Sequence, residues 1–161
     1  MNARRKQNGY FEQQAGAPKP LVIRVKGRAS FSEVDAMGIV WFGRYTSYFE
    51  QGFTELFRHI GLSFEDFRKA KVRAPIVQLH VDYYGPLLLD EEFTIVASLF
   101  YCEGARINIE YEVRRLDNSL AATGFTVQML TGLDRDFYIS APEILLKCRE
   151  RWVRGEFDWM R

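Results

Sequence analysis

The sequence has few of the residues that bind metals or form disulfide frameworks. It contains two histidines, His59 and His80, and two cysteines, Cys102 and Cys148, in 161 residues. Neither pair has the spacing of metal ligands, and two cysteines are too few for a disulfide framework in a chain of this length. We therefore predict no metal site, no cofactor and a fold that a hydrophobic core stabilises.

The sequence also lacks an excess of charge and a long apolar run. Its 22 basic and 21 acidic residues leave a formal net charge of +1, which does not favour a nucleic-acid partner. Apolar runs such as residues 38–42 are far shorter than the roughly 20 residues that a membrane-spanning helix needs. The basic residues 4–6 precede a polar stretch rather than the apolar core of a signal peptide. We expect a cytoplasmic protein with no membrane partner.

Apolar and aromatic residues, in contrast, are plentiful. Hydrophobic residues make up 47% of the chain and aromatic residues 15%, which excludes a disordered protein. Residues 1–20 are polar and show no periodicity, so we predict a flexible N-terminal tail there. The length suits a single domain, over residues 21–155, with residues 156–161 as a C-terminal tail.

Within the first half of the domain, the spacing of apolar residues changes from that of a strand to that of a helix. Apolar and polar residues alternate over residues 21–32, the pattern of a half-buried strand. Helical spacing covers residues 45–60, and Gly61 provides a C-terminal stop. This helix is so aromatic that we expect it to be buried on most sides. A short helix should follow Ser63, with Asp66 completing a capping box.

The second half reads as strands. Four strand patterns follow without another long helix: residues 74–84, 91–102, 106–115 and 120–133. Short turns separate them, so neighbouring strands should pair antiparallel. A last helix is predicted from Ser140, with Glu143 completing a second capping box, to about Trp152. One antiparallel sheet around a single long helix predicts an α+β fold.

The loop before the long helix holds the most informative residue, Asp35. It precedes a helix N-terminus, where unpaired backbone N–H groups and a partial positive charge can hold a developing oxyanion. A carboxylate beside them can activate water as a general base or attack directly as a nucleophile. Residues 39–42 would line an apolar slot for an acyl group. An Asp before Ala-Met-Gly in a loop is most often an Asx-turn residue or a helix cap, so this alternative stays open.

The segment from Phe31 to Phe42, with Tyr45 and the Phe49-Glu50 pair beyond it, resembles the hot-dog-fold acyl-CoA thioesterases. Within them it is similar to the family of hydroxybenzoyl-CoA thioesterase and its bacterial relatives. The shared signature is Asp, two variable residues, Gly, an aliphatic residue, Val and an aromatic residue, followed by a Tyr and an aromatic-Glu pair. The resemblance covers the whole folded region and implies the hot-dog fold, in which an antiparallel sheet wraps around a long central helix.

The resemblance also implies the site and the assembly. Asp35 would be the catalytic carboxylate, and the backbone N–H of Phe42 would polarise the thioester carbonyl. Two protomers would pair their sheets edge to edge as a homodimer, and dimers would pair again into a tetramer. The active site would lie between protomers. The residues assigned to substrate binding are Gly38, Ile39, Val40, Trp41 and Tyr45.

The expected function is hydrolysis of an acyl-CoA or acyl-carrier-protein thioester. Phe42 stands where relatives that act on aliphatic acyl groups carry a His, which favours an aromatic or bulky acyl group, although Ala36-Met37 replaces the Pro-Ala of the aromatic branch. Glu50 is expected to have a structural partner rather than a catalytic role. A hot-dog protein that binds thioesters without hydrolysis and a dehydratase of hydroxyacyl thioesters remain alternatives. Basic residues available for CoA phosphates include Arg106, Arg114, Arg115, Arg135 and Lys147.

Overall fold

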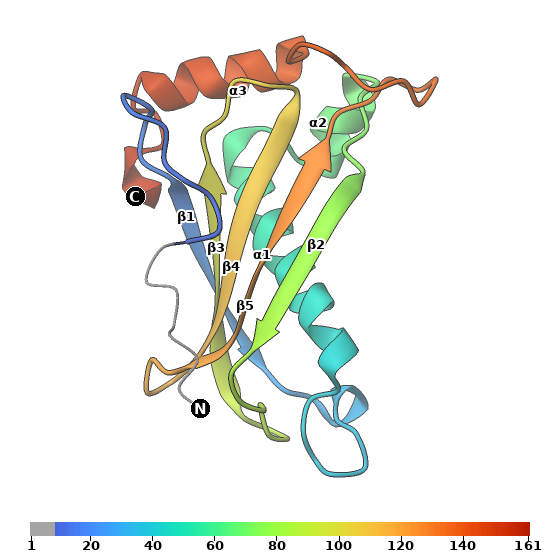
Figure 1. Cartoon of the computed structure of the whole chain (residues 1–161), viewed down its shortest axis with the longest axis vertical. Coiled ribbons are helices and arrows are strands. Elements are labelled where there is room, and N and C mark those ends of the chain that lie inside the picture. Colours follow the sequence, from blue (N-terminus) through green and yellow to red (C-terminus); the bar gives the residue numbers. More distant parts are fainter. Residues whose placement is uncertain (1–8) are drawn as a thin grey trace.

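A computed structural model describes residues 9–161, which form one antiparallel sheet covering a long helix (Figure 1). The strands are β1 (Leu21–Arg28), β2 (Ile76–Tyr83), β3 (Glu92–Phe100), β4 (Arg106–Arg115) and β5 (Leu120–Met129). The helices are α1 (Tyr45–Ile60), α2 (Phe64–Lys69) and α3 (Glu143–Val153). No helix within residues 9–161 is long and apolar enough to cross a membrane.

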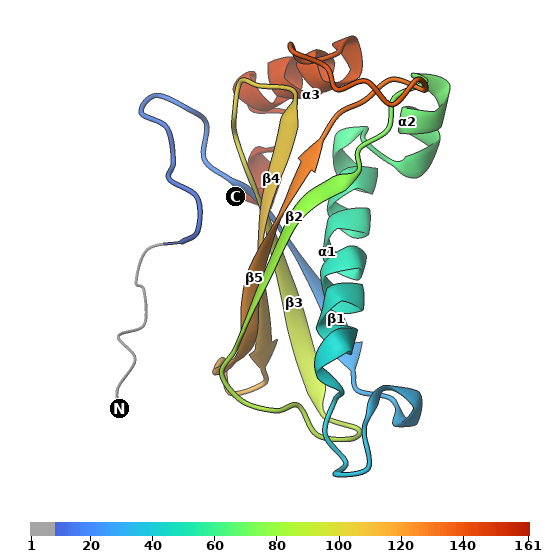
Figure 2. The same ribbon diagram turned by 45° about the vertical axis from the view of Figure 1, so that its right-hand side comes forward.

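The sheet has the strand order β1-β3-β4-β5-β2, and every neighbouring pair is antiparallel. Strands β1 and β2 are therefore its two edges. Helix α1 packs on one face, and Figure 2 shows the sheet between α1 and the N-terminal segment. The predicted α+β fold is confirmed.

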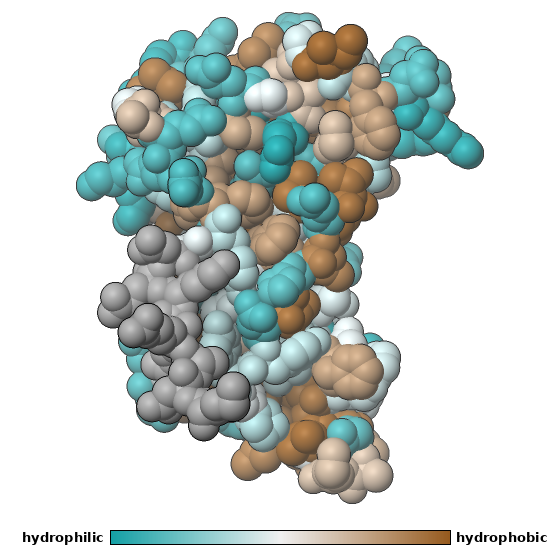
Figure 3. Space-filling model, viewed as in Figure 1, coloured by the Kyte–Doolittle hydropathy of each residue, from teal (hydrophilic) through white to brown (hydrophobic). Residues whose placement is uncertain are grey.

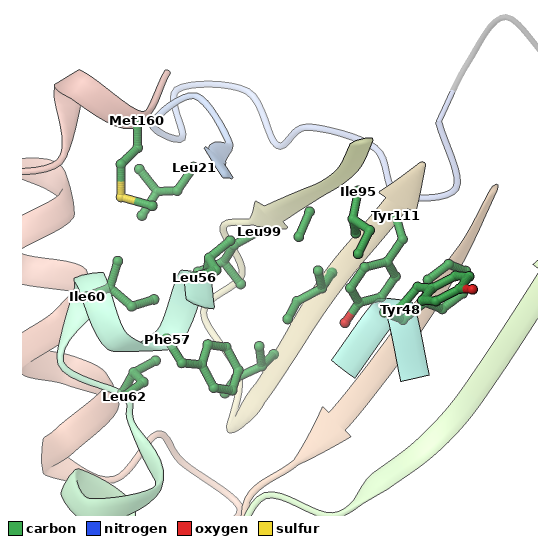
Figure 4. Packing of buried hydrophobic residues seen from close by; sticks show 14 of the residues in the cluster. Leu21, Tyr48, Leu56, Phe57, Ile60, Leu62, Ile95, Leu99, Tyr111 and Met160 are labelled. Atoms are coloured by element: carbon green, nitrogen blue, oxygen red, sulfur yellow. The ribbon is translucent and has the colours of Figure 1, made fainter. Parts of the chain in front are cut away.

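The core lies between α1 and the sheet. Phe49 of α1 stacks on Tyr111 of β4, with ring centroids 4.4 Å apart and 7° between the ring planes. A Cβ at Gly52 would lie 3.1 Å from the side chains of Ile95 and Ala97, so glycine lets α1 approach β3 closely. Figure 4 shows how side chains from α1, the sheet edge and the C-terminus continue this core. Burying each large apolar side chain contributes about 1.5–3 kcal/mol.

Helix α2 begins as predicted, and α3 does not. The Ser63 N–H donates to Asp66 Oδ2 (2.9 Å), and the Asp66 N–H donates to Ser63 Oγ (3.3 Å), so the capping box is confirmed. The predicted start of the last helix at Ser140 is wrong: α3 begins at Glu143, and its N-cap, Pro142, makes no side-chain cap bond. Pro142 disfavours helical backbone angles at the residue before it, Ala141, so a helix cannot run on from Ser140.

Several boundaries differ at the ends of elements. The first strand ends at Arg28 rather than at residue 32, because residues 31–33 form a 3₁₀ turn. Strand β5 ends at Met129, and Thr131 beyond it bridges residues 73 and 137 instead. Residues 156–161, expected as a tail, include a 3₁₀ turn at 158–160. Phe157 and Met160 of that segment are buried in the core.

The N-terminal segment follows the outer face of the sheet. Residues 1–8 of the expected flexible tail lie outside the described residues, and residues 9–20 form no helix or strand. The Tyr10 hydroxyl donates to Asp82 Oδ2 (2.5 Å), and the Phe11 N–H donates to Glu110 Oε1 (2.6 Å). Both rings contact Phe125 of β5. This part of the chain is anchored to the face opposite α1.

Candidate active site

Asp35 lies in a tight loop between β1 and α1. The Asp35 N–H donates to the Ile39 carbonyl (2.8 Å), and the Gly38 N–H donates back to the Asp35 carbonyl (3.0 Å). Gly38 has a φ of 75°, a left-handed conformation that favours glycine. The Val40 N–H donates to the Leu87 carbonyl (2.8 Å), which fastens the loop to the segment before β3. Asp35 is thus held by its own backbone.

The two carboxylate oxygens of Asp35 differ in their surroundings. Oδ1 accepts the Met37 N–H at 2.8 Å, which is the Asx turn that the sequence left open as the alternative. Oδ2 accepts no hydrogen bond from any residue in the described range, and the side chain is half-buried. The turn therefore orients the carboxylate and leaves one oxygen available for chemistry.

The start of α1 presents a free backbone donor. A 3₁₀ turn, Phe42–Arg44, leads into the helix, and within residues 9–161 the Phe42 N–H has no acceptor. Such unpaired N–H groups are what an oxyanion or other anion can bind at a helix N-terminus. The Trp41 ring lies across Gly43, where a Cβ would come within 2.2 Å of it. Glycine at this position therefore lets the indole cover the helix start.

The remaining predicted residues divide between surface and core. The Phe42 ring is 65% exposed and Trp41 is also exposed, whereas Val40 is only 4% exposed. Tyr45 is 2% exposed, and its hydroxyl accepts the Leu87 N–H at 3.4 Å. Burial raises the pKa of Tyr45. Val40 and Tyr45 thus pack beneath the loop in this chain, while Trp41 and Phe42 offer apolar surface.

The end of strand β2 contacts the start of α1. The Tyr83 hydroxyl, at the end of β2, donates to the Phe42 carbonyl at 2.8 Å. The Tyr83 ring packs edge-on against Tyr45, with centroids 5.1 Å apart. The end of β2 therefore adjoins the free N–H of Phe42.

A large cavity lies at the other half of α1. It has a volume of about 1400 Å³ and runs between α1, α2 and the segments 71–75 and 131–137. Five α1 residues with the spacing of one helix face line it: Glu50, Phe53, Thr54, Phe57 and Arg58. Further apolar walls come from Phe64, Phe67, Pro75, Leu133 and Phe137. None of the seven residues that the sequence assigned to the site lines this cavity.

This cavity was not predicted from the sequence. Glu50, for which a structural partner was expected, lines it and makes no ion pair within the described residues. The i, i+3, i+4, i+7, i+8 spacing of the α1 residues in the wall was a readable signal for one helix face. The opposite walls come from loops, which hydrophobic periodicity does not report.

The open edge of β2 connects the two regions. Among the described strands, β2 pairs only with β5, and its Ile76, Val77, Leu79 and Tyr83 side chains are exposed. Hydrophobic side chains gather over β2 and at the end of the molecule that carries the Asp35 loop (Figure 3). An exposed, apolar edge strand is a template for pairing with another chain.

Neither histidine lies in the Asp35 loop. His80 contacts Asp82 (3.0 Å) and His59 contacts Glu55 (3.1 Å). Within residues 9–161, no three His, Cys, Asp or Glu side chains come together as a metal ion would require. The groups that this segment offers are the Asp35 carboxylate and, seven residues later, the Phe42 N–H.

Comparison with known proteins identifies the family. Residues 29–147 match the model of the thioesterase-like superfamily. The chain is 25% identical over 93 residues to the acyl-CoA thioester hydrolase YbgC of Escherichia coli O157:H7, covering 58% of this chain and 69% of that protein.

Solved structures show the same fold. A hypothetical protein from Aquifex aeolicus superposes with a TM-score of 0.71 and 24% identity, covering 79% of this chain and 98% of its own. A 1,4-dihydroxy-2-naphthoyl-CoA thioesterase from Synechocystis gives a TM-score of 0.71 at 15% identity, over 79% and 94% of the two chains. Together with the sheet that wraps α1, these findings confirm the expected hot-dog fold. The chain belongs to the thioesterase-like superfamily and is a thioester hydrolase.

Proposed function

We propose that the protein hydrolyses acyl-CoA thioesters in a site that two copies of the chain form together. The observation that carries the proposal is the separation of parts within one chain. Asp35 and the Phe42 N–H lie before α1, while the cavity lies along its C-terminal half. The α1 residues that line the cavity run from Glu50 to Arg58, which lie about 12–24 Å from Phe42 along the helix axis. A second copy is needed to bring Asp35 to the cavity.

Pairing through β2 supplies that geometry. In a symmetric pair the two β2 strands run antiparallel, so the start of one lies beside the end of the other. The start of β2 follows Ala74 and Pro75, which line the cavity, and its end carries Tyr83, which is bonded to Phe42. The cavity of one copy then faces the Asp35 loop of the other. The homodimer is the active unit, and a tetramer would pair two such dimers.

The reaction needs two protein groups at that junction, the Phe42 N–H and the Asp35 carboxylate. The thioester carbonyl accepts the free N–H of Phe42, which stabilises the oxyanion as it forms. Asp35, oriented through Oδ1, uses Oδ2 either to take a proton from water or to attack the carbonyl directly. The thiolate of CoA leaves, and the acid is released after water has added. Exposed Trp41 and Phe42 shield the acyl group from solvent.

The cavity supports a bulky acyl group on a CoA thioester. Its walls include five phenylalanine side chains: Phe53, Phe57, Phe64, Phe67 and Phe137. Relatives described as acyl-CoA and aromatic acyl-CoA thioesterases share the family or the fold. An aromatic acyl group, with acyl-carrier thioesters as the second choice, suits these rings through stacking.

The test is thiol release from benzoyl-, hydroxybenzoyl-, phenylacetyl- and aliphatic acyl-CoA by the wild type beside Asp35→Asn. The amide keeps the Oδ1 acceptor for Met37 but removes the base, so kcat/KM should fall at least about 100-fold. Asp117→Asn is the matched control, because Asp117 makes the same turn with the Ser119 N–H (2.9 Å) away from the site. Undiminished hydrolysis by Asp35→Asn would refute the role of Asp35. Acyl-CoA binding without any thiol release would favour a binding protein.

A further inference from the structure

The cavity concentrates positive charge in a chain that is nearly neutral. Five basic side chains line it, against two acidic ones, Glu50 and Glu65. The whole sequence has 22 basic and 21 acidic residues. The basic residues are Arg58, Arg68, Lys71, Arg73 and Arg135. Apolar walls with a basic border fit a ligand that is apolar at one end and strongly anionic at the other.

Three of these cations have no counter-ion within residues 9–161. Arg58 pairs with Glu55 (3.0 Å) and Arg68 with Glu65 (2.7 Å). The side chains of Lys71, Arg73 and Arg135 make no ion pair or hydrogen bond with any residue between 9 and 161. We call these three the basic rim. Their charge is available to a ligand.

Backbone hydrogen bonds hold part of the basic rim in place. Arg73 and Thr131 exchange two hydrogen bonds of 2.9 Å, and Thr131 also bridges Phe137. Arg135 lies in the turn between residues 131 and 137, flanked by Asp134 and Asp136, and neither acidic residue lines the cavity. Arg73 and Arg135 therefore belong to adjacent, bonded segments rather than to separate loops.

Two members of the basic rim stand where glycine would be favoured. Lys71 has a φ of 55° and Arg135 a φ of 74°, both in the left-handed region that side chains with a Cβ rarely adopt. A glycine at either position would relieve this conformation. Removing these charges by Gly substitution therefore should not destabilise the fold, which makes the basic rim testable.

We propose that Lys71, Arg73 and Arg135 bind the phosphate groups of the CoA part of the substrate. The inference rests on the proposed function, and it places the polyanionic end of the substrate at the basic rim. The apolar walls receive the acyl group and the neutral pantetheine arm, and the basic rim binds the nucleotide phosphates through charge-assisted contacts. Of the cations considered from sequence, only Arg135 lines the cavity; Arg106, Arg114, Arg115 and Lys147 do not.

The experiment compares two thioesters of the same acid, one of CoA and one of N-acetylcysteamine, which has no phosphate. The variant is Lys71→Gly/Arg73→Ala/Arg135→Gly, and the control is Lys26→Ala, an exposed cation of β1 without an ion pair in the described chain. Each lost contact should raise KM for the CoA ester roughly three- to tenfold, and the triple variant roughly 100-fold. Hydrolysis of the N-acetylcysteamine ester should not change. Calorimetry with free CoA gives a second readout independent of turnover.

Each outcome decides the proposal. Loss confined to the CoA ester and to free CoA binding supports it. An unchanged KM and unchanged CoA binding overturn it, as does a loss seen only with an acyl-carrier-protein thioester, which would assign the basic rim to an acidic protein. If the wild type binds CoA but hydrolyses no thioester, and the triple variant does not bind CoA, the phosphate site is supported while the proposed function fails.

Discussion

In the proposed reaction, the two ends of α1 contribute different parts of the active site. Before its N-terminus lie a carboxylate oriented by an Asx turn and a free backbone N–H, under exposed aromatic rings. Along its C-terminal half lies the cavity, with apolar walls and three cations that make no ion pair in the described part of the chain. The first end has groups that can react, and the second has room for a substrate. Neither is a complete active site by itself.

The difference has a structural cause. The N-terminal end is tied down by short-range bonds, such as that from Tyr83 to Phe42, and the Trp41 ring covers its glycine. In the C-terminal half, one face of α1 packs in the core, and its other face lies opposite α2 and the 131–137 turn, with the open space of the cavity between them. Because α1 is rigid, the two ends cannot approach each other within one chain. In the proposed dimer, the open β2 edge is the element that brings them together.

The largest effect is expected from closing the β2 edge with charge. Val77→Lys/Leu79→Lys places two like charges opposite their own copies in a symmetric pair, where they repel. Both side chains are exposed, so the isolated fold should remain. We expect the mass in light scattering to fall to that of a monomer and thiol release to become undetectable.

Leu146→Lys on α3 is the matched control, because Leu146 is 47% exposed and Leu79 49%. It should alter neither mass nor activity. A monomeric β2 variant that still hydrolyses thioesters at the wild-type rate would show that one chain holds the complete site.

Mixed dimers sharpen the comparison further. Asp35→Asn removes the base, and Thr54→Trp fills the cavity, so each variant alone should be inactive. In a mixed dimer, one site combines the intact Asp35 of one copy with the intact cavity of the other. Random mixing makes half of the dimers mixed, with one of two sites working. Refolding the two variants together should restore about a quarter of wild-type activity.

Two comparisons make this result interpretable. Mixing Asp35→Asn with a Thr54→Trp chain that also carries Asp35→Asn should restore nothing, because no intact Asp35 is present. Wild type taken through the same unfolding and refolding sets the reference. If the first mixture stays inactive while the wild type recovers, Asp35 and the cavity act within one chain.

Much of the fold follows from local pattern. Residues 106–115 alternate strictly and form β4, and the aromatic stripe of residues 45–60 forms α1 at the predicted bounds. Hydrophobic periodicity does not predict the burial of residues in segments that have no regular secondary structure. Phe157 and Met160 complete the core from a 3₁₀ turn, and Tyr10 and Phe11 anchor a segment without any period. Their burial depends on distant partners that a sequence window does not contain.

The site could be predicted only in part for the same reason. The Asp35 loop is a contiguous motif, so its turn, its glycine and the helix start after it can be read from neighbouring residues. The cavity is assembled from α1, α2 and two segments about 60 residues apart. Arg73 and Arg135 face one space only because Thr131 pairs with the chain on both sides. No local spacing encodes that pairing.

The smallest effect is expected at the outer face of the sheet, away from both ends of α1. Burial raises the pKa of Glu110, whose Oε1 accepts the Phe11 N–H at 2.6 Å. The folded state then binds the proton more readily than the unfolded chain, so stability is lost as pH rises from about 4.3, the ordinary value, through the raised pKa. Glu110→Gln keeps an acceptor oxygen without the charge. It should raise Tm at pH 7 by about 2 °C and flatten the dependence of Tm on pH.

Glu12→Gln, at an exposed carboxylate of the same anchored segment, is the control and should leave Tm unchanged. Both variants should retain wild-type kcat/KM, because the outer face touches neither the Asp35 loop nor the cavity. A lower Tm for Glu110→Gln at pH 7 would mean that the charge of Glu110, rather than its oxygen, holds Phe11. A change in kcat/KM would mean that the N-terminal segment acts on the site across the sheet, so that the division between the two ends of α1 would no longer account for activity.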